Sequence, residues 1–379
     1  MKPVFGAGVV YDASKKNRQV QFQTMANGLR TSRMKAYVTK IEDETRKYLA
    51  AEWGNGTGTV DLLLSLSELT ILTASRCLHG EDVRTHIFKD VQALYHDLDH
   101  GLTPLTVFWP TAPTEAHRKR DKARQEMIRL FTNVIEERRQ FPERSDGTDI
   151  LALFMEIVYK DGTKITMEEV TGLLIALLFA GQHTSCISST WTSLFVAKDR
   201  KLLQRILEEQ EKVLGPNNID KKLTFDDVNN MELLHNCMRE ALRLCPTFIM
   251  ILRKVEREFS ITVNDSSYTI PKNDYVVVSP TVSMRLKSSF PDPDTYDPDR
   301  YAPPREEHKV PYTYLGFGGG MHSCMGQNFA FVQVKTILSV LFREYDVELV
   351  APKLPDIGYD DMVVGPKGDC RVKFTKRKY

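Results

Sequence analysis

The sequence has few cysteines, and their arrangement suggests neither disulfides nor a metal cluster. Six cysteines are scattered through 379 residues without a C-x-x-C pair. In a chain of this length, such usage is typical of a reducing compartment, where a special cysteine is a reactive group or a metal ligand. An excess of charge of one sign is also lacking, since 51 Lys and Arg residues balance 50 Asp and Glu residues. This balance excludes a global basic field for nucleic acid.

Long apolar runs and targeting segments are lacking as well. The longest apolar run, residues 173–180, is far shorter than the roughly 20 residues that a membrane helix needs. Met1-Lys2-Pro3 leads directly into Val4-Phe5-Gly6, without the charged and apolar regions of a secretory signal. We therefore expect neither a leader nor a membrane anchor within these residues.

Helical patterns fill the first two-thirds of the chain, and no repeat or low-complexity linker divides it. Thr166 and Glu169 have the spacing of a capping box, which predicts the start of a long helix running toward Phe195. Beyond Pro246, β-branched and aromatic runs predict strands at 261–263 and 275–278. We expect a single domain, residues 1–379, that is mainly α with a small β region. Further helices are expected at 34–53, 60–78, 87–98, 114–139, 231–244 and 328–343.

The most informative segment is residues 317–326, FGGGMHSCMG. A cysteine in a glycine-rich loop before a helix is favoured as a thiolate, because helix N–H groups and the helix dipole lower its pKa. The small residues also let a flat cofactor approach the backbone. From these residues alone, Cys324 is a thiolate ligand, a nucleophile or a buried structural cysteine. A dinucleotide loop is disfavoured, because Met321 stands where its third glycine belongs.

Two further motifs precede this loop, and the three together resemble the signature of the cytochrome P-450 family. Glu240 and Arg243 form E-x-x-R, a pair on one helix face that is by itself usually a surface feature. Residues 298–301, PDRY, resemble the family's P-E-R-F segment, and residues 317–326 fit F-x-x-G-x-x-x-C-x-G. The resemblance implies the cytochrome P-450 fold, with Cys324 as the axial thiolate ligand of the iron of haem b. It also implies that Arg300 joins Glu240 and Arg243 in a structural cluster.

A polar run, residues 179–185 (FAGQHTS), interrupts the long apolar helix. Polar residues and a glycine are costly there and normally indicate a site, although a satisfied core histidine is the alternative. The run resembles the G-Q-H-T-S segment of sterol 14α-demethylases, a group within the cytochrome P-450 family. Five further segments resemble the same group, particularly its plant and algal members, which are of the obtusifoliol 14-demethylase type. They are residues 5–12, 69–80, 95–101, 117–124 and 362–365.

This resemblance implies a monooxygenase that removes the 14α-methyl group of a sterol precursor. O2 would be the oxidant, and NADPH–cytochrome P-450 reductase would deliver the electrons of NADPH. His183 and Thr184 would be the catalytic residues that relay protons. The residues implied to bind haem are Cys324, His322, Arg253, Phe317, Gly318 and Tyr11. Those implied to line the sterol cavity are Phe5, Tyr11, Phe179, Ala180, Phe248, Met250 and Met362.

The sequence also departs from the family's pattern. Met321 and Ser323 stand where basic residues are usual, which predicts altered docking of the reductase. The family's membrane anchor, first helices and first sheet strands would precede Phe5, so we expect an N-terminally incomplete chain. The complete protein would lie on the cytosolic face of the endoplasmic reticulum membrane. The alternatives are a cytochrome P-450 with another substrate, a haem or sterol binder without turnover, and an inactive fragment.

Overall fold

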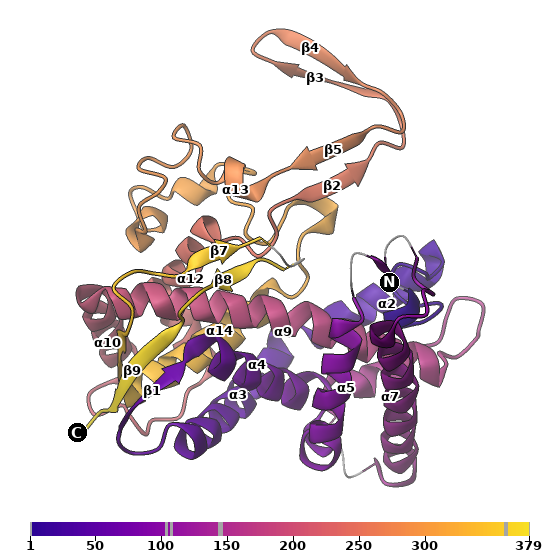
Figure 1. The fold of residues 1–379 in the computed structure, drawn as a ribbon, viewed down its shortest axis with the longest axis horizontal. Helices are drawn as coiled ribbons and strands as arrows, with labels where there is room; N and C mark the ends of the chain where they lie inside the picture. Colours follow the sequence, from indigo (N-terminus) through magenta and orange to yellow (C-terminus); the bar gives the residue numbers. More distant parts are fainter. Residues whose placement is uncertain (1, 103–104, 107–108, 143–146, 360–362, 379) are drawn as a thin grey trace.

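Helices form most of the structure, as the sequence predicts. The computed structural model describes residues 2–378 apart from 103–104, 107–108, 143–146 and 360–362. A layer of helices lies on one side of the central helix α9, and a smaller lobe of strands and turns lies on the other (Figure 1). The helices are α1 (Lys2–Phe5), α2 (Lys15–Gly28), α3 (Thr31–Glu52), α4 (Leu62–Leu78), α5 (Phe88–His100), α7 (Glu115–Gln140), α8 (Ile150–Met155), α9 (Met167–Lys198), α10 (Arg200–Leu214), α11 (Phe225–Asn230), α12 (Glu232–Leu244), α13 (Pro280–Ser283) and α14 (Gln327–Glu344), with a π-helical turn at Val83–Ile87.

Helix α9 is the axis of the fold, and its start confirms the predicted capping box. The Glu169 N–H donates to Thr166 Oγ1 at 3.2 Å, and the Thr166 N–H donates to Glu169 Oε2 at 2.9 Å. Among the described residues, α9 alone is long and apolar enough to cross a membrane by length and composition. Most of its apolar stretch is nevertheless buried inside the protein, as in a core helix. Buried side chains from Val4 to Phe374 pack around it in one continuous core.

The expected helix at 60–78 begins later than predicted, because a strand precedes it. Strand β1 (Thr57–Asp61) pairs with β9 (Arg371–Lys376), which also pairs with β6 (Tyr345–Leu349), all antiparallel. Asp61 ends the strand and caps α4, since its carboxylate accepts the N–H groups of Leu63 and Leu64. Gly58 lies opposite Phe374, whose ring would be 2.7 Å from a Cβ at that position. Strands that are far apart in the sequence thus form one sheet.

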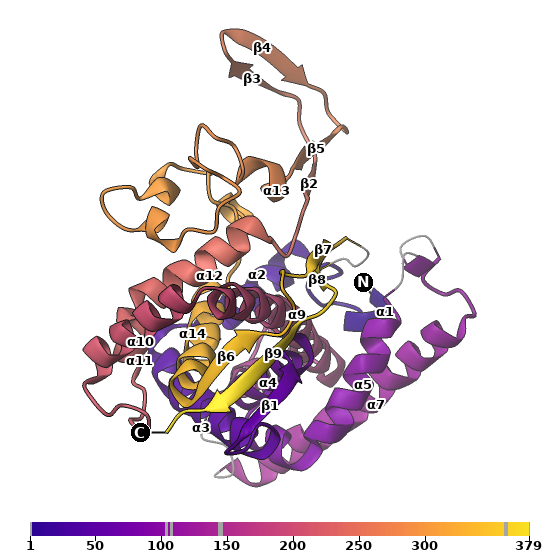
Figure 2. The ribbon, with the colours of Figure 1, turned by 60° about the vertical axis from the view of Figure 1, so that its left-hand side comes forward.

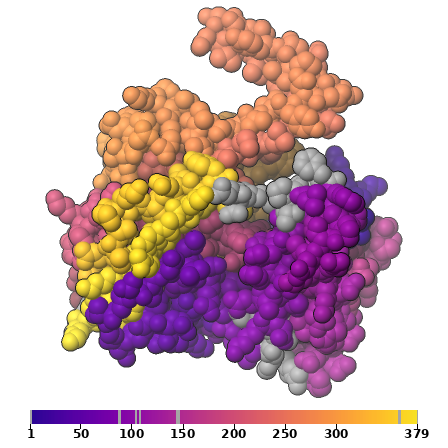
Figure 3. Space-filling view, in the orientation of Figure 1, coloured from indigo at the N-terminus to yellow at the C-terminus, as the bar shows by residue number. Residues whose placement is uncertain are grey.

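The β-rich lobe carries a projecting arm of four strands. Strand β2 (Ile251–Lys254) pairs with β5 (Tyr275–Val278), and β3 (Phe259–Val263) pairs with β4 (Ser266–Ile270). The hairpin of β3 and β4 extends away from the body in both ribbon views and in the space-filling view (Figures 1, 2 and 3). All residues of β3 are exposed. The remaining described strands, β7 (Asp356–Gly358) and β8 (Gly365–Lys367), form a short ribbon beside α9.

Candidate functional site

The glycine-rich segment forms a tight loop that ends at helix α14. The Cys324 N–H donates to the Phe317 carbonyl at 2.9 Å, and the Gly318 N–H donates to the Leu315 carbonyl at 3.0 Å. Gly318 and Gly320 have φ angles of +71° and +67°, a conformation that favours glycine. The loop therefore holds Cys324 just before the N-terminus of α14, as the sequence predicts.

The surroundings of the Cys324 thiol act on its pKa in opposite directions. Desolvation by the loop raises the pKa, whereas the backbone N–H groups of Gly326 and Gln327 donate toward the sulfur and lower it. The net direction is upward. The lowering by backbone N–H groups that the sequence predicts is therefore present, and desolvation opposes it.

Cys324 differs from the other cysteines in its accessibility. All six cysteines lie in the described part of the chain, and Cys324 is exposed while the other five are buried. A ligating or reacting thiol must be reachable, and a structural thiol is normally enclosed. This contrast disfavours the interpretation of Cys324 as a buried structural cysteine.

The polar run of α9 lies on a part of the helix that is not fully covered. Ala180 is exposed, and a Cβ added to Gly181 would meet no atom within 4 Å. Thr184 Oγ1 donates to the Ala180 carbonyl at 2.7 Å. His183 Nε2 lies 3.2 Å from Oδ1 of Asp99 on α5, so the imidazole is held by a carboxylate from a neighbouring helix. His183 is thus partly exposed and paired, unlike a core histidine.

An aromatic cluster joins two of the residues expected at the sterol cavity. The rings of Phe5 and Phe179 meet edge to face, with centroids 5.7 Å apart. Tyr95 on α5 packs against Phe179 at 4.6 Å and lies 6.0 Å from the His183 ring. Tyr95 and Asp99 are four residues apart and share one face of α5, toward α9. Sequence reasoning had noted this segment only as part of the resemblance and had assigned neither residue a role.

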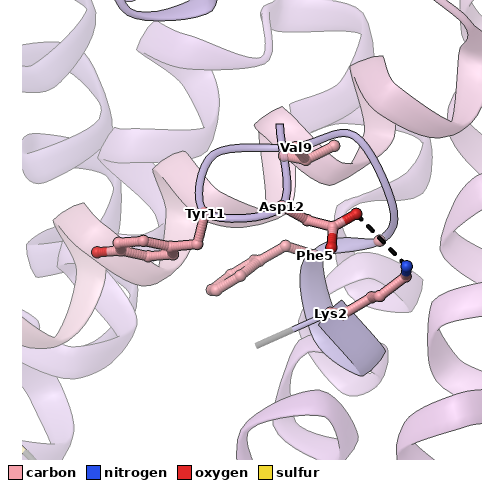
Figure 4. A pocket seen from close by; sticks show the side chains of 6 residues that line it. Lys2, Phe5, Val9, Tyr11 and Asp12 are labelled. Atoms are coloured by element: carbon pink, nitrogen blue, oxygen red, sulfur yellow. Dashed lines mark ion pairs between the residues drawn. The ribbon is translucent and has the colours of Figure 1, made fainter. Parts of the chain in front are cut away.

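Other residues expected at the site are exposed. The exposed fractions of Tyr11, Phe248 and Met250 are 71%, 47% and 62%. Phe5, Tyr11, Gly6 and Val9 border a shallow pocket of about 130 Å³ together with the ion pair of Lys2 and Asp12 (Figure 4). That volume is too small for a whole sterol. Met362 lies outside the described residues.

The structure brings Glu240, Arg243 and Arg300 together in a fully buried ionic cluster. Arg243 Nε lies 2.7 Å from Glu240 Oε2, and Arg300 Nε lies 2.8 Å from Glu240 Oε1. The Tyr301 hydroxyl also donates to Glu240, at 2.9 Å. Both arginines donate further to backbone carbonyls of residues 284–295, which have little regular secondary structure. The cluster thus fastens this segment to α12.

These residues fit a haem group. An exposed thiol with two N–H groups directed at its sulfur suits an iron ligand. The open space beside Gly181 and the exposed Ala180 leave room for a flat ring against α9. His322 and Arg253 are both exposed and available to carboxylate groups, and Phe317 is half-buried against Phe331.

Comparisons with known proteins agree with this site. The family model described as cytochrome P-450 matches residues 3–374, and the chain belongs to the cytochrome P-450 family. The solved structure of a retinoic-acid-bound cyanobacterial CYP120A1 has the same fold, with a TM-score of 0.84 and 21% sequence identity over 99% of this chain and 82% of that one.

Curated relatives place the chain within that family. It is 43% identical to a sterol 14-demethylase of Arabidopsis thaliana, over 99% of this chain and 76% of the relative. Identity is also 43% to an obtusifoliol 14-alpha demethylase of Triticum aestivum, of which the chain covers 82%. It is 38% to a lanosterol 14-alpha demethylase of Homo sapiens, of which the chain covers 72%. The chain therefore groups with the sterol 14-demethylases.

Proposed function

We propose that the chain is a haem-thiolate monooxygenase that removes the 14α-methyl group of a sterol precursor in sterol biosynthesis. The observation that carries this proposal is the exposed Cys324 loop before α14, in a chain whose core helix also carries the polar, incompletely covered run Gly181–Ser185. When bound, the haem supplies oxygen activation, and successive oxidations, each using O2 and an electron pair from NADPH, release the methyl carbon as formate. The release of formate leaves a new double bond in the sterol ring.

Different residues would bind the haem and the sterol. Cys324 would hold the iron, and His322 and Arg253 would pair with the haem propionates. The aromatic cluster of Phe5, Phe179 and Tyr95 would offer an apolar wall to the sterol. One haem-thiolate domain over residues 1–379 is supported by the main core, which draws its buried residues from both 4–245 and 329–374, while Met284, Phe290 and Leu315 form a small second cluster.

Two measurements test the proposal directly. The reduced chain should give a thiolate-type carbon monoxide difference spectrum, and with NADPH and a cytochrome P-450 reductase it should convert a 14α-methyl sterol. We expect both signals. A thiolate spectrum and sterol binding without product would instead support a binder, and the absence of any thiolate spectrum would contradict the haem assignment.

His183 and Asp99 are proposed as the proton-handling pair. The Asp99 carboxylate lies 3.2 Å from His183 Nε2, so it can orient the imidazole. Thr184 follows on the same helix, and its hydroxyl is held by the Ala180 carbonyl. A proton could pass from solvent through Asp99 and His183 toward Thr184.

Replacing His183 by alanine should slow sterol turnover on the order of 10²-fold, the usual contribution of a general acid. Asp99→Asn should slow it less, because the amide keeps a hydrogen bond but loses the charge. Haem content and the sterol dissociation constant should remain near those of the wild type in both variants. His96→Ala is the matched control, since His96 lies on the exposed side of the same helix as Asp99. Loss of haem or of folded protein in His183→Ala would favour a structural histidine.

The remaining partners are also proposals. Electrons would come from NADPH–cytochrome P-450 reductase, and the protein would work at the cytosolic face of the endoplasmic reticulum membrane. Neither of the two positions near Cys324 where basic residues are usual carries a charge, since they are Met321, which is 96% exposed, and Ser323. This composition supports a docking contact with less electrostatic character than in the rest of the family.

A further inference from the structure

The loop between α1 and α2 holds an unfavourable backbone conformation. In Figure 4 the rings of Phe5 and Tyr11 extend to one side of this loop, and Asp12 and Lys2 lie on the other. Val10, at its centre, is buried and has a φ angle of +47°. A β-branched residue is strained in this left-handed region, so the conformation persists only where surrounding contacts enforce it.

The side chain of Gln21 supplies those contacts. Gln21 lies on α2 and is fully buried. Its Oε1 accepts the N–H of Val10 at 3.1 Å, and its Nε2 donates to the carbonyl of Gly8 at 2.8 Å. One amide group thus hydrogen-bonds to the backbone on both sides of Val9, in addition to the loop's own hydrogen bonds from the Gly8 N–H to Asp12 Oδ2 and from the Asp12 N–H to the Val9 carbonyl.

The same amide ties the loop to the start of α9. Gln21 Nε2 also donates to the Tyr159 hydroxyl at 3.0 Å, and that hydroxyl donates to Glu169 Oε1 at 3.0 Å. Burial is the main cause that raises the pKa of Tyr159, to about 12, so its proton is retained near neutral pH. Glu169 belongs to the capping box of α9. A continuous hydrogen-bonded chain therefore runs from the loop to the helix that carries His183.

The loop between α1 and α2 packs closely against helix α9. A Cβ on Gly172 of α9 would lie 2.0 Å from the Phe5 carbonyl oxygen, and one on Gly8 would lie 2.9 Å from Glu169 Oε1. All the side-chain hydrogen bonds of Gln21 go to this region. An apolar side chain of the same volume would avoid the cost of burying an amide. Packing alone does not explain a buried amide with this set of partners.

We propose that Gln21 is a positioning residue for the substrate: through Tyr159 and Glu169 it holds the loop of residues 6–12 against α9 and so places Phe5 and Tyr11 for the sterol. The inference rests on the proposed sterol 14α-demethylase function. It assigns Gln21 no chemical step, so its loss should weaken sterol binding and leave the rate at saturating sterol nearly unchanged.

The test compares Gln21→Leu with Gln333→Leu. Gln333 is also fully buried on a helix, and its Nε2 also makes two hydrogen bonds, to the Thr70 carbonyl and to Thr73 Oγ1, remote from the loop. In Gln21→Leu, amide hydrogen exchange of residues 8–12 without sterol should quicken at least tenfold, and the KM and spectral dissociation constant for sterol should rise roughly five- to tenfold. The kcat should stay within about twofold. Tyr159→Phe keeps the hydrogen bonds between Gln21 and the loop but removes the one to Glu169. It should change hydrogen exchange and sterol affinity in the same direction but by less.

Each outcome decides the proposal. Equal effects of Gln21→Leu and Gln333→Leu on hydrogen exchange and sterol affinity would overturn it, because a non-specific loss of stability would then explain both variants. Faster exchange with unchanged sterol affinity would also overturn it, because the clamp would then not serve the substrate. A wild-type chain that binds no sterol would contradict the proposed function, whereas the exchange comparison in the absence of sterol would still show whether Gln21 holds the loop.

Discussion

Replacing Cys324 by serine is expected to abolish the thiolate-type carbon monoxide difference spectrum and, with it, sterol turnover. Serine keeps the size and the hydrogen-bonding capacity of the side chain, and the glycines that shape the loop are untouched. A hydroxyl cannot replace a thiolate as the electron-rich axial ligand of a haem iron. The variant should therefore fold with nearly wild-type thermal stability but lose the spectrum completely.

A second cysteine variant separates this effect from general damage. Cys370 is buried in the core and far from the loop in sequence, so Cys370→Ala should leave the spectrum and its position unchanged. Spectra recorded at equal protein concentration, together with haem per chain, provide the measurement. If the thiolate-type spectrum survived in Cys324→Ser, the assignment of the ligand would be wrong.

Replacing Glu240 by glutamine is expected to prevent the chain from accumulating as a stable folded protein. The carboxylate is fully buried and pairs with Arg243 and Arg300, both of which are also fully buried. Arg300 has a second partner in Glu307, whereas Glu240 is the only carboxylate that pairs with Arg243 among the described residues. Removing one partner of a buried ion pair typically destabilises a protein by about 3–5 kcal/mol, because the remaining charge is left without compensation. That loss is comparable to much of the stability of an ordinary domain.

The chain offers a control with the same spacing. Glu126 and Arg129 also form an i, i+3 pair, on the exposed surface of α7. Glu126→Gln should leave the melting temperature and the soluble yield unchanged, because exposed pairs contribute little. Thermal unfolding and haem content of the two variants, measured side by side, check the prediction. Similar stability of the two variants would show that burial of the Glu240 cluster is unimportant.

Features that depend on neighbouring residues in the sequence were predictable. The capping box at Thr166 and Glu169, the glycine-rich Cys324 loop and the long core helix all follow from local patterns, and the structure contains each of them. The Glu240–Arg243 pair was also visible, although its spacing alone could not distinguish a buried cluster from a surface pair. The three cytochrome P-450 motifs in order, together with their resemblance to the family, supplied that distinction.

Features that depend on partners far apart in the chain were not predictable in the same way. Strand β1 pairs with β9, more than 300 residues later, so Thr57–Asp61 carries no local signal strong enough to separate it from the following helix. The contacts of Asp99 with His183 and of Gln21 with Tyr159 likewise join segments that are far apart in the sequence. The exposure of Tyr11, Phe248 and Met250 could not be read from residue type, because the apolar character of a residue indicates a preference for burial and not its outcome.

The projecting hairpin offers a place to attach a probe without disturbing the core. Within the described part of the chain, β3 and β4 pair only with each other. Their connection, Asn264-Asp265, has φ angles of +48° and +61°, values that suit these two residue types at a tight hairpin turn. Exposed loop tips of this kind tolerate insertions well. A short tag or a fluorophore carried by a peptide inserted between Asn264 and Asp265 would therefore leave the haem pocket and the helical layer intact.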